Sequence, residues 1–103
     1  NMKLIELINA VKEEHLTKDQ LEDYRDQLSN LFAQMQLELA EIEKYRAIRM
    51  EEMRVANPND SEVRLKGNWQ STSSGQREIE LKRYCLATKE MLNSLKSRLY
   101  SIY

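Results

Sequence analysis

The stretch LKRYCLATKEMLNSLKSRLYSI, residues 81–102, decides the fold of this chain of 103 residues. Its apolar and small residues recur in steps of four and three, and they are Leu81, Cys85, Thr88, Leu92, Leu95, Leu99 and Ile102. Such steps form the a/d seam of a coiled-coil helix. Ser73 and Gln76 are spaced as a capping box ahead of the seam. The sequence therefore predicts a last helix over residues 76–102.

A second, longer seam lies upstream of this helix. Apolar residues from Leu21 to Met53 again recur in steps of three and four, which predicts a helix over residues 18–56. Thr17 and Gln20 form a capping box at its start. The dipeptide Asn57-Pro58 ends it, because the residue before a proline is disfavoured in helical geometry.

The remaining segments are a short helix and a connection. Apolar residues returning on one side predict a first helix over residues 3–15, and residues 57–75 are predicted to be a loop. Within this loop, Ser61–Lys66 reads either as a short turn of helix or as a strand. The domain prediction is a single helical domain over residues 1–103.

These elements predict an all-α fold, a long antiparallel helical hairpin with an extra short N-terminal helix. The last helix is too short to cover all of the second, so apolar surface near Leu21–Met35 meets either the first helix or another subunit. A three-helix monomer remains an alternative, but we expect a coiled-coil-like homo-oligomer. The expected interface residues are Leu28, Leu31, Met35, Leu81, Leu92, Leu95, Leu99 and Ile102.

Composition argues against several classes of function. One Cys and one His cannot supply the ligands of a zinc site, so we expect no metal and no cofactor. The carboxylate pairs Glu13–Glu14 and Glu51–Glu52 are adjacent and point to different sides of a helix, and no phosphate-binding loop occurs. We therefore expect no enzymatic activity. A lone Cys85 fits a reducing, cytoplasmic environment, and the apolar run LIELINAV is too short to span a membrane.

The charge distribution points to a polyanion. Residues 1–43 carry four bases against ten acids, whereas residues 44–103 carry twelve bases against seven acids. Lys82, Lys89 and Lys96 are spaced by seven and predict a row along one flank of the last helix, with Arg98 near its end. Ammonium groups in such a row suit a phosphate backbone, because each contact releases condensed counterions. The alternative is that these charges are solvated, or pair with the acidic half of a neighbouring subunit.

The only tryptophan stands in a polar segment. Trp69 follows Arg64 and Lys66, and it either packs on its own hairpin, anchors a partner subunit or stacks on a base. An aromatic side chain between basic residues favours binding of single-stranded nucleic acid. Arg64, Lys66 and Trp69 are therefore candidate nucleic-acid contacts.

The ending REIELKRYCLATKEMLNSLKSRLYSI resembles the C-terminal helix of phage recombination mediators of the UvsY type. The shared features are Leu95–Arg98, Tyr100 and Ile102. The segment ELAEIEKYRAIRMEEMR resembles the helix before the loop in that family, with basic positions Lys44, Arg46 and Arg49. The resemblance covers residues 38–103, and the acidic N-terminal helix and the loop have no clear counterpart.

The resemblance implies an oligomeric, phage-encoded helical protein of the host cytoplasm. Such a protein binds single-stranded DNA and helps a RecA-like recombinase to displace single-strand-binding protein. Lys44, Arg46 and Arg49 would then join Lys82, Lys89, Lys96 and Arg98 on the phosphates. The competing interpretation is a coiled-coil interaction or assembly protein, for example a phage inhibitor or adaptor that binds a host protein.

Overall fold

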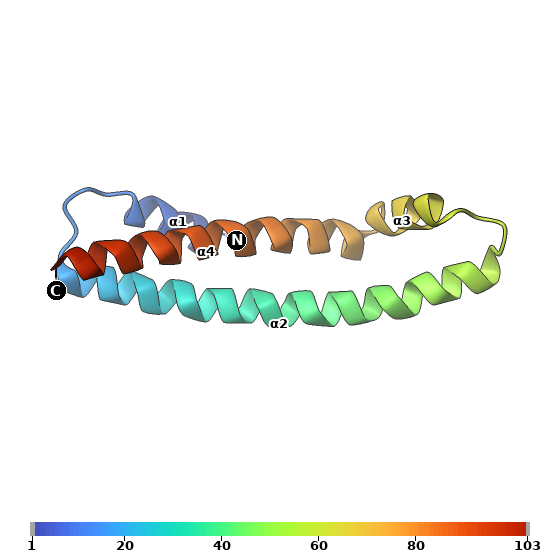
Figure 1. Ribbon diagram of the computed structural model, residues 1–103, viewed down its shortest axis with the longest axis horizontal. Helices are drawn as coiled ribbons and strands as arrows, with labels where there is room; N and C mark the ends of the chain where they lie inside the picture. The colour runs from blue at the N-terminus through green and yellow to red at the C-terminus, as the bar shows by residue number, and fades with distance from the viewer. Residues whose placement is uncertain (1, 103) are drawn as a thin grey trace. The chain divides into compact units, whose positions relative to one another are not determined.

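The computed structural model describes residues 2–102, and within them it is all-helical. The helices are α1 (Met2–Val11), α2 (Lys18–Ala56), α3 (Glu62–Gln70) and α4 (Ser73–Ile102). The long α2 and α4 pack as a hairpin, and α1 is the short N-terminal helix (Figure 1). The predicted fold class is confirmed.

Contacts divide the chain into two compact units. Unit 1 holds the residues up to Met35 and those from Tyr84 onward, and unit 2 holds Gln36–Arg83. Unit 1 therefore contains α1, the first part of α2 and most of α4. Unit 2 contains the rest of α2, all of α3 and the start of α4.

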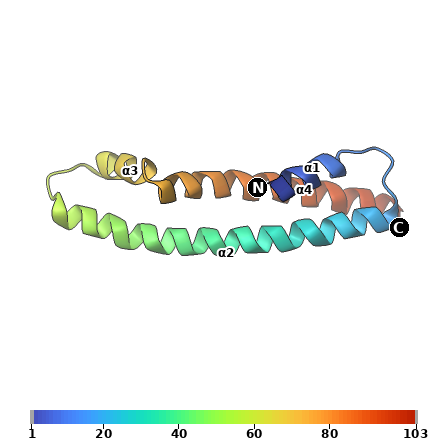
Figure 2. The same cartoon turned by 180° about the vertical axis from the view of Figure 1, so that it is seen from behind.

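Unit 1 is a three-helix arrangement with an aliphatic core. Both views show α1 along the C-terminal part of α4 (Figures 1 and 2). Its buried side chains are Leu4, Leu7 and Val11 from α1, Leu21, Leu28, Leu31 and Met35 from α2, and Thr88, Leu95 and Leu99 from α4. Within this unit, the surface that needed a partner near Leu21–Met35 is thus buried with the first helix.

The start of α2 matches its prediction, but α1 is shorter than predicted. Thr17 N–H donates to Gln20 Oε1 at 2.9 Å, and Gln20 N–H donates to Thr17 Oγ1 at 3.2 Å, which is the capping box. The helix predicted over residues 3–15 ends at Val11. Arg98 explains this end, because its guanidinium donates to the carbonyls of Val11 and Glu13 at 2.6 and 2.9 Å and satisfies acceptors that another helical turn would have used.

The predicted loop over residues 57–75 is wrong, because most of it is helical. Ser61 caps α3: its Oγ accepts the Arg64 N–H at 3.1 Å, and Glu62 lies in the positive first turn. Leu65 and Trp69, four residues apart, form the buried stripe of this short helix. Ser61–Lys66 is therefore helix and not strand, apart from the cap itself.

The start of α4 also differs from the prediction. The capping side chain is Thr72 and not Ser73: Thr72 Oγ1 accepts the Gly75 N–H at 3.0 Å and donates to the Trp69 carbonyl at 2.6 Å. Helix α4 consequently begins at Ser73, three residues before the predicted start. Gln76 reaches back to the Gln70 carbonyl at 2.6 Å instead of to a cap. Thr72 thus joins the end of α3 to the start of α4.

Most residues expected at an oligomer interface are core residues of the chain itself. The buried ones are Leu28, Leu31, Met35, Leu81, Leu95 and Leu99, with exposed fractions of 8 % or less. Only Leu92 and Ile102 keep a larger accessible surface. The a/d seam is therefore used within the hairpin, and the six buried side chains are not available to a second subunit.

Candidate nucleic-acid interface

Trp69 is the centre of the unit 2 core and not a surface residue. Its side chain is 2 % exposed, and its Nε1–H donates to Glu78 Oε1 at 3.2 Å. The Tyr45 ring lies 5.7 Å from the indole at a tilt of 54°. The other oxygen of Glu78 accepts from Arg46 at 2.8 Å. The tryptophan packs within its own hairpin, so the alternative of a base stacked on its face is not supported.

The two arginines predicted on α2 are held in intramolecular ion pairs. Arg46 pairs with Glu78, whose side chain is almost fully buried, and Arg49 pairs with Glu52 at 2.9 Å. Lys44, by contrast, is exposed and makes no hydrogen bond or ion pair with the described residues. Of the three α2 positions, only Lys44 keeps an unengaged charge.

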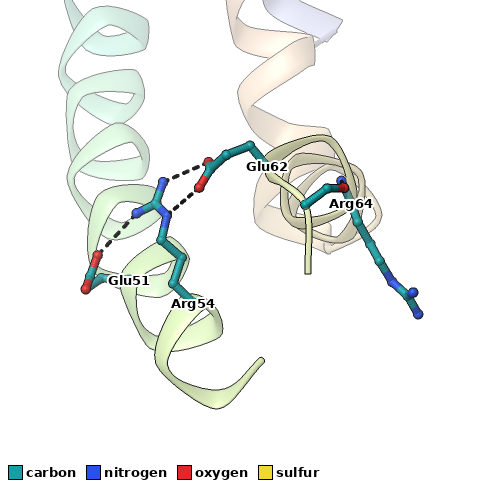
Figure 3. A network of polar contacts seen from close by, with 5 residues as sticks. Glu51, Arg54, Glu62 and Arg64 are labelled. Carbon is teal, nitrogen blue, oxygen red and sulfur yellow. Dashed lines mark hydrogen bonds and ion pairs between the residues drawn. The ribbon is translucent and has the colours of Figure 1, made fainter. Parts of the chain in front are cut away.

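A further arginine that sequence reasoning missed joins α2 to α3. Arg54 lies between two carboxylates, donating to both oxygens of Glu62 at 2.8 and 3.0 Å and to Glu51 at 3.2 Å (Figure 3). This hydrogen bonding raises the pKa of Arg54 and lowers that of Glu62, each partner stabilising the charged form of the other. The fork matches the bidentate geometry of an arginine–carboxylate pair, which the spacing of eight residues does not reveal.

Arg64 points away from this cluster in Figure 3. Its side chain is 72 % exposed and pairs loosely with Asp60 at 3.7 Å. Arg64 and Lys66 are both basic side chains on the surface of α3. Of the three contacts predicted in this segment, these two are therefore accessible, whereas Trp69 is buried. Arg64 remains accessible to a ligand, because such exposed pairs contribute little stability.

A groove in unit 2 brings several predicted bases together. Arg46, Lys66 and Lys82 line it together with Trp69, and Arg54, Glu62 and Glu78 line it too. The two arginines are neutralised by the two glutamates, as described above. Among the described residues neither Lys66 nor Lys82 has a hydrogen-bond or ion-pair partner. These two lysines therefore supply the free positive charge of the groove.

Unit 1 contains the remaining basic residues predicted to bind nucleic acid. Here too the lysines are without carboxylate partners in the described chain, and the arginine is engaged. Lys89 and Lys96 are exposed on α4, and no carboxylate of the described residues pairs with either. The Lys96 ammonium lies 5.9 Å from the centre of the Tyr100 ring, a cation–π distance. Arg98 is only partly exposed, and it is occupied by the carbonyls of Val11 and Glu13. Its role is to hold the end of α1.

No metal-binding arrangement is evident in residues 2–102. Within that range no group of three or more His, Cys, Asp or Glu side chains is placed to hold a metal ion. Burial raises the pKa of the Cys85 thiol, which disfavours the reactive thiolate. None of the helices described is long and apolar enough to cross a membrane.

No protein-family model, curated protein or solved structure matches this chain.

Proposed function

We propose that the protein binds single-stranded DNA and acts, without a chemical step, as a recombination mediator or accessory protein for a RecA-like recombinase. The observation that carries the proposal is the state of the lysines: Lys89 and Lys96 on α4 are exposed and have no carboxylate partner in the described chain. An unpaired ammonium keeps its full attraction for a phosphate, and two of them seven residues apart lie on one side of a helix. The preference for single strands and the role as mediator come from the resemblance of residues 38–103.

Six of the ten side chains predicted as nucleic-acid contacts remain in the proposal. Lys44, Arg64, Lys66, Lys82, Lys89 and Lys96 are retained because they are exposed and are either unpaired or, for Arg64, weakly paired. Arg46 and Arg98 are set aside because they hold internal contacts, and Trp69 because it is buried. Arg49 is set aside because its pair with Glu52, at 2.9 Å, is closer than the 3.7 Å pair of Arg64.

A few lysines per chain bind weakly, so the proposed activity requires several copies. Linked copies convert weak contacts into useful avidity by raising the effective concentration of each next site. A homo-oligomer would present the strand in an extended form to the recombinase while competing with single-strand-binding protein. This role needs no chemical step, because the protein only holds and positions the DNA strand.

Fluorescence anisotropy of a labelled oligo-dT at about 50 and about 200 mM salt tests the proposal. We expect saturable binding that weakens steeply with salt, with the slope reporting about 0.7 counterions for each phosphate neutralised on a single strand. Replacing Lys89 and Lys96 together by Glu should abolish most of the affinity at the lower salt. A folded double variant that binds like the wild type would refute the assignment to these lysines.

A matched pair of single variants separates position from net charge. Lys89→Glu and Lys12→Glu each reverse one exposed lysine, but Lys12 lies beyond the end of α1 and outside the proposed contacts. We expect a loss of affinity for Lys89→Glu only. Equal losses for the two variants would mean that overall charge, and not this surface, governs binding.

One observation favours a second candidate, a non-enzymatic coiled-coil interaction or assembly protein. In unit 2 a shallow apolar hollow on α2 is lined by Ala47, Ile48, Val55 and Ala56, with Glu51 and Glu52 among them. Ile48 and Val55 are 54 % and 75 % exposed. Sedimentation velocity of the wild type and of an Ile48→Glu/Val55→Glu variant tests this candidate. Assembly that is lost in the variant, in a protein without DNA affinity, would favour it over the mediator.

A further inference from the structure

A groove in unit 1 combines groups that the sequence does not place together. Arg25 and Ser29 from α2 face Asn93, Lys96 and Tyr100 from α4, and Leu92 and Leu99 complete the lining. Its volume of about 480 Å³ falls in the range of small-ligand sites, roughly 300–1,000 Å³. The groove thus has two cations, two neutral hydrogen-bonding side chains, an aromatic ring and apolar side chains.

Tyr100 is unusual among the aromatic residues that the structure describes, because it is exposed and has no packing role in the core. Its side chain is 69 % exposed, whereas Trp69 is 2 % exposed. The described contact of the ring is with the Lys96 ammonium at 5.9 Å. An exposed aromatic beside a cation is the pairing that proteins use for single strands, since a base stacks on the ring while the cation meets a phosphate.

The second cation of the groove, Arg25, can exchange its present ion-pair partner for a phosphate. Arg25 pairs with the neighbouring Asp26 through hydrogen bonds of 3.3 Å, and the Asp26 side chain is 68 % exposed. An exposed pair of this kind contributes about 0–1 kcal/mol, so a phosphate can compete for the guanidinium. Lys96 forms no ion pair with a carboxylate of residues 2–102. Both cations are therefore open to an anionic ligand.

We infer that this groove holds one nucleotide of a single strand, with the base on Tyr100 and the flanking phosphates on Lys96 and Arg25. Ser29 and Asn93 can hydrogen-bond to the base edge or to the sugar, and Leu92 and Leu99 contact its apolar surface. Lys89 lies seven residues before Lys96 on α4 and continues the cationic side of the groove toward the next phosphate. The inference rests on the proposed function and deepens it by naming the residue that contacts a base.

The test compares two oligonucleotides that share a backbone, a dT strand of about 15 nucleotides and an abasic strand of the same length, close to the upper end of known site sizes. Anisotropy should show that the wild type prefers the dT strand. Tyr100→Leu should reduce affinity for dT about fivefold or more, as expected for one lost stacking contact, and leave the abasic strand unaffected. Tyr100→Phe keeps the ring and should keep the preference. Arg25→Gln should weaken binding to both strands.

Each outcome separates the two proposals. If the wild type binds neither strand, the proposed function and this inference both fail. If it binds dT and Tyr100→Leu retains the preference, the groove assignment fails while DNA binding stands. If Tyr100→Leu changes the sedimentation coefficient but not DNA binding, the groove receives a second copy of the chain, which also overturns the inference.

A positive readout that does not depend on folding of variants is photo-crosslinking of the wild type to an oligo-dT carrying 5-iodo-deoxyuridine. We expect a crosslink that peptide fragmentation assigns to Tyr100. Crosslinks confined to unit 2 would place the strand elsewhere and contradict the assignment.

Discussion

The two units have cores of different chemistry. Unit 1 buries aliphatic side chains from three helices, and Thr88, which donates to its own helix at Tyr84 O, is its only buried polar residue among those described. Unit 2 buries Trp69 around a charged side chain, Glu78, which is 4 % exposed. An aliphatic core is non-directional and tolerates adjustment, whereas a buried carboxylate needs each of its hydrogen bonds. Unit 2 should therefore be the more sensitive to single substitutions.

The basic residues show a second contrast, between arginine and lysine. In unit 2 five of the six arginines (Arg46, Arg49, Arg54, Arg64 and Arg77) form ion pairs with described residues, and Arg83 is the exception, while Lys44, Lys66 and Lys82 form none. A planar guanidinium with five donors suits carboxylates, and a flexible ammonium stays hydrated. A charge count over the sequence therefore overstates the positive charge that a ligand can meet.

The largest expected effect is on the junction of α3 and α4. A Cβ on Gly75 would lie 2.0 Å from the Trp69 carbonyl oxygen and 2.8 Å from its carbonyl carbon, so backbone must move. Gly75→Ala should lower the free energy of unfolding by about 3 kcal/mol or more, at the upper end of overpacking effects. Urea denaturation followed by Trp69 fluorescence measures the change.

Gly67 provides the matched control on the preceding helix. A Cβ there meets nothing within 4 Å, and the residue is exposed within α3. Gly67→Ala should raise the free energy of unfolding by up to about 1 kcal/mol through helix propensity. Equal behaviour of the two alanine variants would mean that the tight approach at Gly75 is not a feature of the folded protein.

The next largest expected effect is the loss of stability when the buried carboxylate of unit 2 is replaced by an aliphatic side chain. Glu78→Leu removes the acceptor of the Trp69 Nε1–H and of Arg46, and should destabilise the protein by about 2 kcal/mol. Glu80→Leu, two residues along α4, removes only an exposed pair with Arg77 and should cost at most about 1 kcal/mol. Chemical denaturation of both variants measures the difference. Similar values would show that the hydrogen bonds of Glu78 add little and that the two cores behave alike.

Sequence periodicity predicted the two long helices well and the segment around α3 poorly, for a physical reason. The seam from Leu81 to Leu99 and the Thr17 capping box are local patterns, and local patterns determine helices. The indole of Trp69 is covered through a tertiary contact with Glu78, nine residues away across a turn, which no spacing rule specifies. The Ser61 cap and the Leu65–Trp69 spacing were the available signals for α3, but a segment of nine residues is short for a periodic signal.

For the candidate site, the sequence predicted the residues that share one side of a helix but not the contacts between helices. Regular spacing identified Lys89 and Lys96, because helix geometry alone places them on one side. It could not show that Arg98 reaches back across 87 residues to the Val11 carbonyl, or that Arg25 faces Tyr100 across a groove. The spacing of Lys96 and Tyr100 by four was a usable signal for the ring, since such neighbours meet on a helix surface.

The smallest expected effect is a pH dependence confined to the ion pairs of unit 2. The hydrogen bonds from Arg54 hold the pKa of Glu62 below its ordinary value. Because the folded-state pKa is lowered, the contribution of this pair to stability is complete above the ordinary carboxyl pKa and is lost as pH falls through the lower, folded value. NMR titration of the Glu62 side chain should show this lowered midpoint, and amide exchange in α3 should speed up over the same acidic range.

In Arg54→Gln the midpoint should return toward the ordinary value, and α3 should exchange faster already at neutral pH. Glu52→Gln is the control variant: it removes a pair made with Arg49 within α2 and should leave α3 exchange unchanged. A Glu62 midpoint that does not move between the wild type and Arg54→Gln would contradict the fork seen in Figure 3 and remove the arginine as the link between α2 and α3.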